Sequence, residues 1–137
     1  METLFKSLMI SAAGMRAQGT RLRVISENIA NAQSTGDSAG AAPYRRKTIS
    51  FENELDRSLG LNLVQVGRIG LDRSEFVRRY EPGHPAADDD GYVLFPNVNA
   101  LVEANDMREA QRSYEANLSV IEASRSMLQR TVELLRR

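Results

Sequence analysis

The sequence contains no cysteine and no tryptophan, and it contains a single histidine, His84. The absence of cysteine excludes disulfides, thiolate zinc sites and cysteine nucleophiles. A single histidine excludes a histidine-rich metal cluster and most histidine-based acid–base machinery. The composition therefore offers few of the groups from which enzymes build active sites.

The sequence also lacks an excess of either charge and lacks a long hydrophobic run. Eighteen basic residues balance eighteen acidic residues in 137, so the chain as a whole does not attract phosphate. No run of eighteen apolar residues is present, so we expect no membrane span. The first ten residues contain an early acid, Glu2, and no unbroken apolar core, so we expect no cleaved signal peptide. We therefore expect no nucleic-acid partner and no bilayer-spanning segment.

Aromatic residues make up 6% of the chain and proline occurs four times, whereas 42% of the residues are hydrophobic. Apolar side chains at helical spacing predict one long helix over residues 4–32. Its main row is spaced by sevens and widened on one side: Leu8, Met15, Leu22 and Ile29, with Leu4 and Ile25. A second row lies roughly 200° around the helix: Ile10, Ala17 and Val24. Gly14 and Gly19 interrupt the pattern, either as close-packing points or because the helix is not stable alone.

A second long helix is predicted near the C-terminal end, with Asn97 or Asn99 as its N-cap. Its apolar residues cover more than a third of the circumference, which exceeds a two-helix seam. We expect oligomeric or polymeric packing, because solitary proteins rarely expose so much apolar surface. The central row and its two flanks are Met107, Tyr114, Ile121, Leu128 and Leu135, then Leu118 and Val132, then Val120, Met127 and Leu134.

The segment between the helices contains β-strand patterns and several candidate sites. We expect short strands that end near Phe51 and cover 61–69 and 74–80. Asp88–Asp90 before Gly91 is similar to a calcium loop, but the required ligands are absent at both ends, which favours a solvated acidic turn. His84 lies in a turn without a nucleophile, which favours a structural role.

Two basic runs stand in the same segment, Arg45–Lys47 beside Tyr44 and Arg78–Arg79 beside Tyr80. Basic residues beside an aromatic ring can contact phosphate and stack on bases. Acidic residues nearby offset the first run, so we interpret these runs as charged protein-contact surface.

Motifs near both ends resemble those of the flagellar rod, hook and hook-associated proteins, the axial family of the bacterial flagellum. The N-terminal motif comprises Ser11-Ala12-Ala13-Gly14-Met15, Gln18, Arg21-Leu22 and Ser26-Glu27-Asn28-Ile29-Ala30-Asn31-Ala32. The C-terminal motif comprises Asn97-Val98-Asn99, Glu103, Asp106-Met107, Glu109-Ala110, Arg112, Tyr114-Glu115-Ala116-Asn117 and Val120-Ile121. Proximal-rod members of the family are also similar at Pro43-Tyr44-Arg45-Arg46-Lys47, Gly83-His84-Pro85 and Gly91-Tyr92-Val93-Leu94-Phe95-Pro96-Asn97.

The resemblance implies a non-enzymatic structural subunit of the basal-body proximal rod in the periplasm, without a cofactor, that assembles helically and transmits motor torque. The implied partners are other copies, other proximal and distal rod proteins, the export-gate adaptor protein and the flagellar type III export apparatus. The terminal helices are expected to stay disordered until they pair. We therefore predict a mainly α fold, an antiparallel coiled coil of the terminal helices with a small irregular β-rich insertion. The expected segments are 1–33 and 97–137 for the coiled-coil axial domain, 34–43 for a flexible loop and 44–96 for the middle segment.

Two groups of residues are predicted to carry assembly. The coiled-coil group is Leu4, Leu8, Met15, Leu22, Ile25, Ile29, Met107, Tyr114, Leu118, Ile121, Leu128 and Leu135. The candidates for contacts with neighbouring subunits are Ile10, Val24, Asn28, Asn31, Tyr44, Arg45, Arg46, Val120, Met127 and Leu134. A soluble helical adaptor or chaperone that binds one partner through the same stripes is the alternative, and a small enzyme using His84 and the acidic run is a second.

Overall fold

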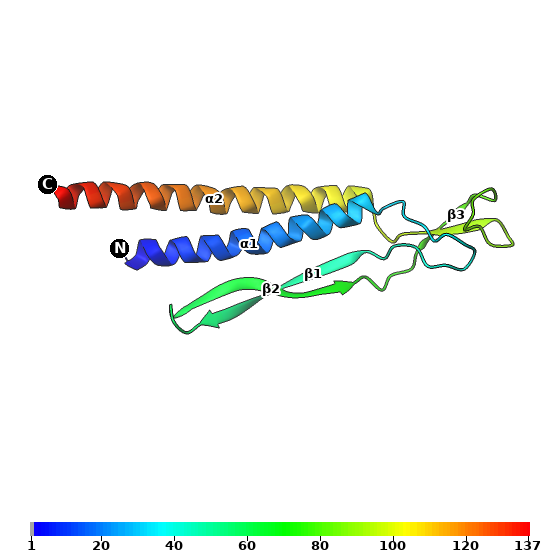
Figure 1. The fold of residues 1–137 in the computed structure, drawn as a ribbon, viewed down its shortest axis with the longest axis horizontal. Coiled ribbons are helices and arrows are strands. Elements are labelled where there is room, and N and C mark those ends of the chain that lie inside the picture. The colour runs from blue at the N-terminus through cyan, green and yellow to red at the C-terminus, as the bar shows by residue number, and fades with distance from the viewer. Residues whose placement is uncertain (1) are drawn as a thin grey trace. The chain divides into compact units, whose positions relative to one another are not determined.

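The computed structural model describes residues 2–137, in which two helices and four strands are present (Figure 1). Their order is α1 (Glu2–Ala30), β1 (Lys47–Asp56), β2 (Leu61–Leu71), β3 (Val77–Tyr80), β4 (Tyr92–Phe95) and α2 (Ala100–Arg136). The chain divides into two compact units. Unit 1 contains the residues up to Leu22 together with 50–68 and 108–137, and unit 2 contains 23–49 and 69–107. Each unit therefore combines segments that are distant in the sequence.

The second helix begins where the sequence predicts, because Asn99 caps its first turn. Asn99 Oδ1 accepts hydrogen bonds from the backbone N–H groups of Leu101 at 3.0 Å and Val102 at 3.4 Å. The Asn99 carbonyl accepts the first helical bond, from Glu103 N–H, at 3.0 Å. A side-chain oxygen that satisfies the free N–H groups of the first turn is the usual N-cap arrangement. Of the two caps that the sequence offers, Asn99 is therefore the one in use.

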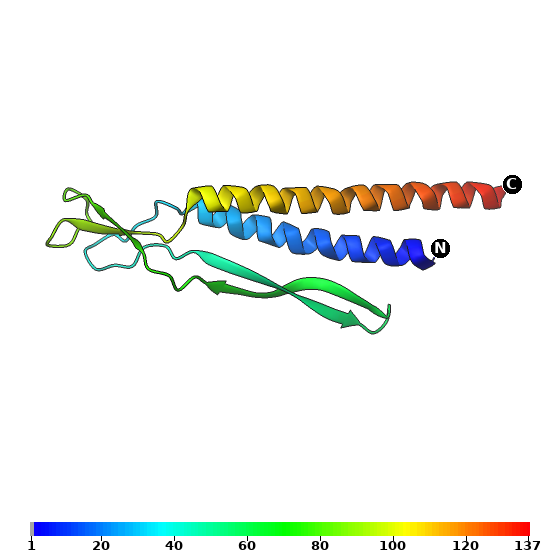
Figure 2. The ribbon, with the colours of Figure 1, turned by 180° about the vertical axis from the view of Figure 1, so that it is seen from behind.

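Within unit 1 the two helices lie side by side and run antiparallel (Figures 1 and 2). Gly14 lies against Asn117, and Arg21 forms an ion pair with Glu109 at 3.6 Å. Positions further along α1 thus meet positions nearer the start of α2, which fixes the antiparallel order.

The two glycines inside α1 have different surroundings. A Cβ atom at Gly14 would lie 2.8 Å from Nδ2 of Asn117, closer than side chains normally approach. At Gly19 the nearest atom, Cε2 of Tyr114, would be 4.0 Å away, which is an ordinary contact. Gly14 is therefore a close-packing point between the helices, whereas packing does not require a glycine at position 19.

Small and polar residues occupy the interior positions of both helices. On α2 these positions recur every seven residues, at Glu103, Ala110, the half-buried Asn117 and Ser124. Small side chains shorten the distance at which two helices pack. The buried residues of α1 are Ser11, Ala13, Ala17, Val24, Ile25 and Asn28.

β1 and β2 form a two-stranded hairpin whose strands are 10 and 11 residues long. Asp56 closes its turn, because Asp56 Oδ1 accepts hydrogen bonds from the N–H groups of Ser58 at 3.0 Å and Leu59 at 3.2 Å. Bonds from the Ser58 hydroxyl and the Leu59 N–H hold the pKa of Asp56 below its usual value. Gly60 adopts φ +65°, a conformation that favours glycine, and completes the turn.

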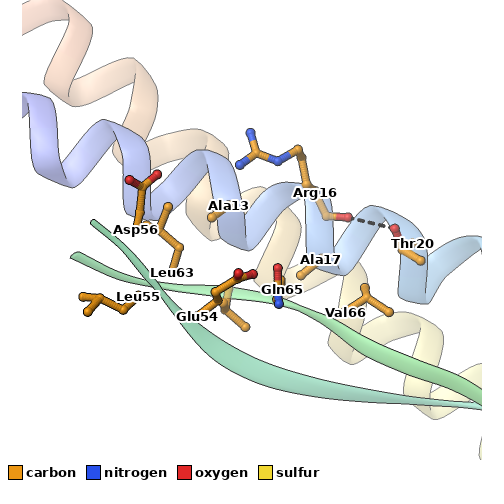
Figure 3. Close-up of a pocket in the computed structure, with 11 residues that line it drawn as sticks. Ala13, Arg16, Ala17, Thr20, Glu54, Leu55, Asp56, Leu63, Gln65 and Val66 are labelled. Carbon is orange, nitrogen blue, oxygen red and sulfur yellow. Dashed lines mark hydrogen bonds between the residues drawn. The ribbon is translucent and has the colours of Figure 1, made fainter. Parts of the chain in front are cut away.

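Within unit 1 the hairpin covers one face of α1 (Figure 3). Ala13 and Ala17 are each 3% exposed, and they line a groove of about 500 Å3 together with Leu63 and Val66 of β2. Figure 3 shows Leu63 pointing toward the helix. Part of the second apolar face of α1, which the sequence analysis reserved for neighbouring subunits, is therefore covered by the chain itself.

β3 and β4 form a separate antiparallel ribbon within unit 2. Val77 lies opposite Phe95, and Tyr80 lies opposite Tyr92. The rings of Tyr80 and Tyr92 meet edge to face with their centroids 5.4 Å apart. Val93 and Phe95 of β4 form an apolar cluster with Ala86, and Ala87 packs against it.

The predicted fold class, a mainly α antiparallel coiled coil, is wrong. The chain is 49% helical and 21% strand, with two antiparallel sheets beside the helical pair. The prediction ended the first strand near Phe51, where the alternating stretch 48–51 ends. The strand continues to Asp56, since Glu52 and Glu54 are on the surface and need no burial. The segment predicted as a small irregular insertion therefore contains a long hairpin that packs on α1 within unit 1.

Candidate assembly site

The residues of the predicted coiled-coil group lie at three depths. Nearly all the positions of the central rows are half-buried: Leu4, Leu8, Met15 and Leu22 on α1, and Met107, Tyr114, Ile121 and Leu128 on α2. Ile25 is buried, whereas Ile29, Leu118 and Leu135 are exposed. The most interior positions of the helix pair belong to the smaller residues described above.

The predicted contacts with neighbouring subunits also separate by exposure. Ile10, Val120, Met127 and Leu134 are exposed. Asn31, Tyr44, Arg45 and Arg46 are half-buried. Val24 and Asn28 are 3% and 1% exposed, so their side chains are already enclosed within the chain and present no surface to a neighbour.

The end of α2 carries the largest apolar exposure in unit 1. Leu134 is 71% exposed and Leu135 is 77% exposed. Met127 and Val132 are 54% and 47% exposed. Several large apolar residues on one short stretch of helix form the kind of surface through which proteins associate.

In unit 2, a polar cluster centred on Asn28 connects segments that are distant in the sequence. Asn28 Oδ1 accepts hydrogen bonds from the Tyr44 hydroxyl at 2.7 Å and from the Lys47 N–H at 2.9 Å. Asn28 Nδ2 donates to the Lys47 carbonyl at 2.9 Å and approaches Glu103 Oε2 at 3.5 Å. This one amide therefore holds the start of β1 against the end of α1.

Arg46 is the charged centre of the same cluster. Its Nε donates to Glu103, whose side chain is fully buried. Its two terminal nitrogens lie 3.4 Å from Asp72 and 3.7 Å from Asp106. The planar guanidinium presents donors in several directions and can serve three carboxylates at once. Removing Arg46 would therefore leave the carboxylate of Glu103 buried without its cation.

Asn97 and an ion pair complete the cluster. Asn97 Oδ1 accepts from the Arg46 N–H at 2.8 Å, and Asn97 Nδ2 donates to the Asp72 carbonyl at 3.0 Å. Lys47 Nζ lies 2.8 Å from Glu27 Oε2. The hydrogen bond from Lys47 and the positive charge of Lys47 hold the pKa of Glu27 below its ordinary value. The same hydrogen bond and the negative charge of Glu27 raise the pKa of Lys47 above its ordinary value. Hydrogen bonds from Ser74 lower the pKa of Asp72.

The acidic run Asp88–Asp90 and His84, which the sequence analysis weighed as a calcium loop and a catalytic residue, make hydrogen bonds that fix local backbone turns. Asp88 Oδ1 accepts hydrogen bonds from the N–H groups of Asp90 and Tyr92, which is a turn geometry. His84 Nδ1 accepts from the Ala86 N–H at 3.0 Å, and Nε2 lies 3.4 Å from Thr35 Oγ1. Among residues 2–137, no group of three or more His, Cys, Asp or Glu side chains is placed to hold a metal ion. No helix in that range is long and apolar enough to cross a membrane.

The basic runs stack on aromatic rings of unit 2. The guanidinium carbon of Arg45 lies 4.1 Å from the centroid of the Phe76 ring, and that of Arg78 lies 4.2 Å from the centroid of Tyr92. Arg45 also donates to the carbonyls of Asp72 and Ser74. At least these two arginines are therefore occupied within the unit by cation–π contacts.

Sequence reasoning singled out Asn28 and Arg46, but as contacts with neighbouring subunits, and it missed the roles of Glu103 and Asn97 in organising unit 2. Glu103 and Asn97 belong to the motif of the axial family, but polarity alone suggests a surface position for both. Spacing gave a signal for Glu103, since it stands seven residues before the buried Ala110. A polar residue in register with small interior residues predicts a buried hydrogen-bonded group.

Comparison with known proteins gives consistent matches over this architecture. Residues 89–134 match the family described as the flagellar basal body rod FlgEFG protein C-terminal region. The chain is 53% identical to the flagellar basal-body rod protein FlgC of Agrobacterium fabrum, over 99% of this chain and 98% of that protein. The FlgC proteins of Borreliella burgdorferi and Salmonella typhimurium are 38% and 35% identical, over 96% and 91% of this chain and 97% and 92% of theirs. This chain therefore belongs to the FlgC family of flagellar basal-body rod proteins.

Proposed function

We propose that this structural subunit of the flagellar basal-body rod is held in the rod by the apolar rows of α1 and α2. In this proposal it assembles helically with copies of itself and with other proximal and distal rod proteins. The observation that carries the proposal is the apolar surface at the end of α2, where Leu134 and Leu135 are 71% and 77% exposed. Burial of apolar surface yields about 25 cal/mol per Å2, so coverage by neighbours would favour assembly.

The proposed contacts follow the predicted residues that the units leave accessible. The half-buried rows on the two helices, such as Leu22 and Ile121, hold the helices together and continue into neighbouring helices. Exposed positions such as Ile10 and Met127 face other subunits. Residues 97–137 and 1–33 thus supply the axial helices, and the polar cluster of unit 2 gives each subunit a rigid part through which torque passes.

The proposed site of action is the periplasmic part of the basal body, close to the export-gate adaptor protein. We propose that the chain reaches it through the flagellar type III export apparatus, with terminal helices that order on assembly. The small and polar interior of the helix pair supports this step, because the pair buries few large apolar side chains before a neighbour arrives.

Substitution of Met15 tests the proposed function. A Met15→Glu chain should be produced in normal amounts but be absent from purified basal bodies, and the cells should be non-motile. A Met15→Leu chain keeps the row apolar and should be incorporated normally. Normal rods containing the Met15→Glu chain would contradict the proposal.

A soluble adaptor or chaperone would use the same stripes without polymerising, and it predicts a different isolated protein. Its helices should be fully formed by circular dichroism, and both ends should resist limited proteolysis. A rod subunit should lose its termini to protease quickly before assembly.

A further inference from the structure

The hairpin of unit 1 has its apolar and charged faces arranged in an unusual way. Glu54 and Asp56 line the groove against α1, and Figure 3 shows their carboxylates turned toward the helix. Leu55 also lines the groove, yet it is 55% exposed, and the alternation of a strand turns its side chain to the face opposite Glu54 and Asp56. Phe51, four residues earlier on the same face of the strand, is 38% exposed. A half-covered sheet normally turns its apolar face inward, so the outer face of β1 lacks its cover.

One face of α1 offers a surface of matching character. We call it the α1 stripe; it consists of Phe5, Leu8, Ala12 and Met15. These residues carry no charge, Phe5 is 51% exposed, and the others are half-buried. At about 100° per residue, the stripe lies roughly 120° around the helix from the positions that face the chain's own hairpin. The hairpin of the same chain therefore covers another face.

The two surfaces agree in length and in chemistry. Phe51 and Leu55 are separated by about 13 Å at a rise of roughly 3.3 Å per strand residue. The α1 stripe extends over about 15 Å at a rise of roughly 1.5 Å per helix residue. Neither surface presents a charge that the other would bury unpaired. The pairing of this hairpin with small residues of α1, seen at Ala13 and Ala17, already occurs within the chain.

We infer that the outer face of β1, through Phe51 and Leu55, packs on the α1 stripe of a second copy of this chain. The inference rests on the proposed function, because it needs a structure in which copies lie side by side. Each chain carries both surfaces, and the two surfaces differ. Such a contact is heterologous and adds copies in one direction around a helix instead of closing a dimer.

Cysteine cross-linking tests the contact cleanly, because the chain has no cysteine of its own. Cells would produce a Leu55→Cys chain together with an Ala12→Cys chain, and purified basal bodies would be oxidised. Since each chain carries one thiol, a product of twice the 15.3 kDa chain mass that contains both substituted chains joins two copies. The control replaces Leu55→Cys by Glu54→Cys, whose side chain faces the opposite way on the same strand. We expect about tenfold more of this mixed product from the Leu55 pair, because disulfides require Cβ atoms within about 4.5 Å.

Equal yields of the mixed disulfide from the two pairs would overturn the inference. Basal bodies that contain both substituted chains but no mixed disulfide would also overturn it, and so would a disulfide that joins the Leu55→Cys chain to a different rod protein. A Leu55→Glu chain should also be incorporated at a lower level than a Leu55→Met chain, and equal incorporation would contradict the contact. Absence of the unsubstituted chain from basal bodies would instead refute the proposed function.

Discussion

The two compact units of this chain are stabilised in different ways. In unit 2, directional polar contacts join distant segments, as in the bonds of Asn28 to Tyr44 and of Arg46 to Glu103. In unit 1, the helices meet through small residues such as Gly14 and Ala110, and the hairpin packs on Ala13 and Ala17. Polar networks specify one geometry, because each bond has a required direction. Contacts between small residues tolerate adjustment, so unit 1 is suited to adapt to neighbours while unit 2 keeps its shape.

The largest effect is expected when the charged centre of unit 2 is removed. An Arg46→Ala chain leaves the buried carboxylate of Glu103 without its cation, which costs about 3–5 kcal/mol. The free energy of unfolding, measured with denaturant, should fall by that amount. Arg73→Ala, at an exposed arginine of the same unit, is the control and should change it by less than about 0.5 kcal/mol. Equal effects of the two substitutions would contradict the role given to Arg46.

An intermediate effect is expected at the helix contact of unit 1. Gly14→Leu should destabilise the chain by about 1–3 kcal/mol, because the new side chain overlaps Asn117. Gly19→Ala should stabilise it by about 1 kcal/mol, since the helix gains propensity and the new Cβ atom would make only an ordinary contact with Tyr114. Thermal unfolding followed by circular dichroism measures both. A stable Gly14→Leu chain would show that the helices do not approach closely there.

Acid should weaken unit 2, because two of its carboxylates, Glu27 and Asp72, have lowered pKa values. The ordinary values of Glu27 and Asp72 are 4.5 and 3.8, and both pKa values are lower in the folded chain. Their contribution is complete above the ordinary values and is lost as the pH falls through the folded ones. The melting temperature should therefore fall below about pH 4.5. In a Glu27→Gln chain the melting temperature should fall less steeply with pH. If its pH dependence were unchanged, the ion pair of Glu27 with Lys47 would be excluded as a source of the acid sensitivity.

The smallest effect on stability is expected at the end of α2. Leu134→Ser and Leu135→Ser remove exposed side chains, so each should change the free energy of unfolding by less than about 0.5 kcal/mol. Both should nevertheless lower the amount of chain in purified basal bodies, measured by immunoblotting. If either substitution lowered the free energy of unfolding but left incorporation unchanged, the proposal that the end of α2 serves assembly would be contradicted.

Much of the helical architecture follows from the sequence, because periodicity and capping act locally. The helix predicted over 4–32 is present over Glu2–Ala30, and the one predicted to start beside Asn99 does so. The length of β1 does not follow, since Glu52 and Glu54 on a surface strand give no alternating apolar pattern. A strand of this kind is specified by its partner strand and by the turn at Asp56.

The interior of the helix pair was the least predictable part. Hydrophobicity selects Tyr114 and Ile121, whereas the most buried α2 positions are Glu103, Ala110 and Ser124. Burial of Glu103 depends on Arg46, which is 57 residues earlier in the chain. No local pattern carries such a pairing. The residues for contacts between subunits stay predictions, because a single chain does not contain the surfaces that would cover them.

The interleaved composition of the two units affects the order in which the protein can be made and folded. Both units need residues of α2, which follow all the others in the sequence. During translation, the earlier segments therefore wait on the ribosome with incomplete interiors, and neither unit can close until its share of α2 has emerged. In the export that we propose, this open interval is when the secretion channel would receive the chain in an extended form.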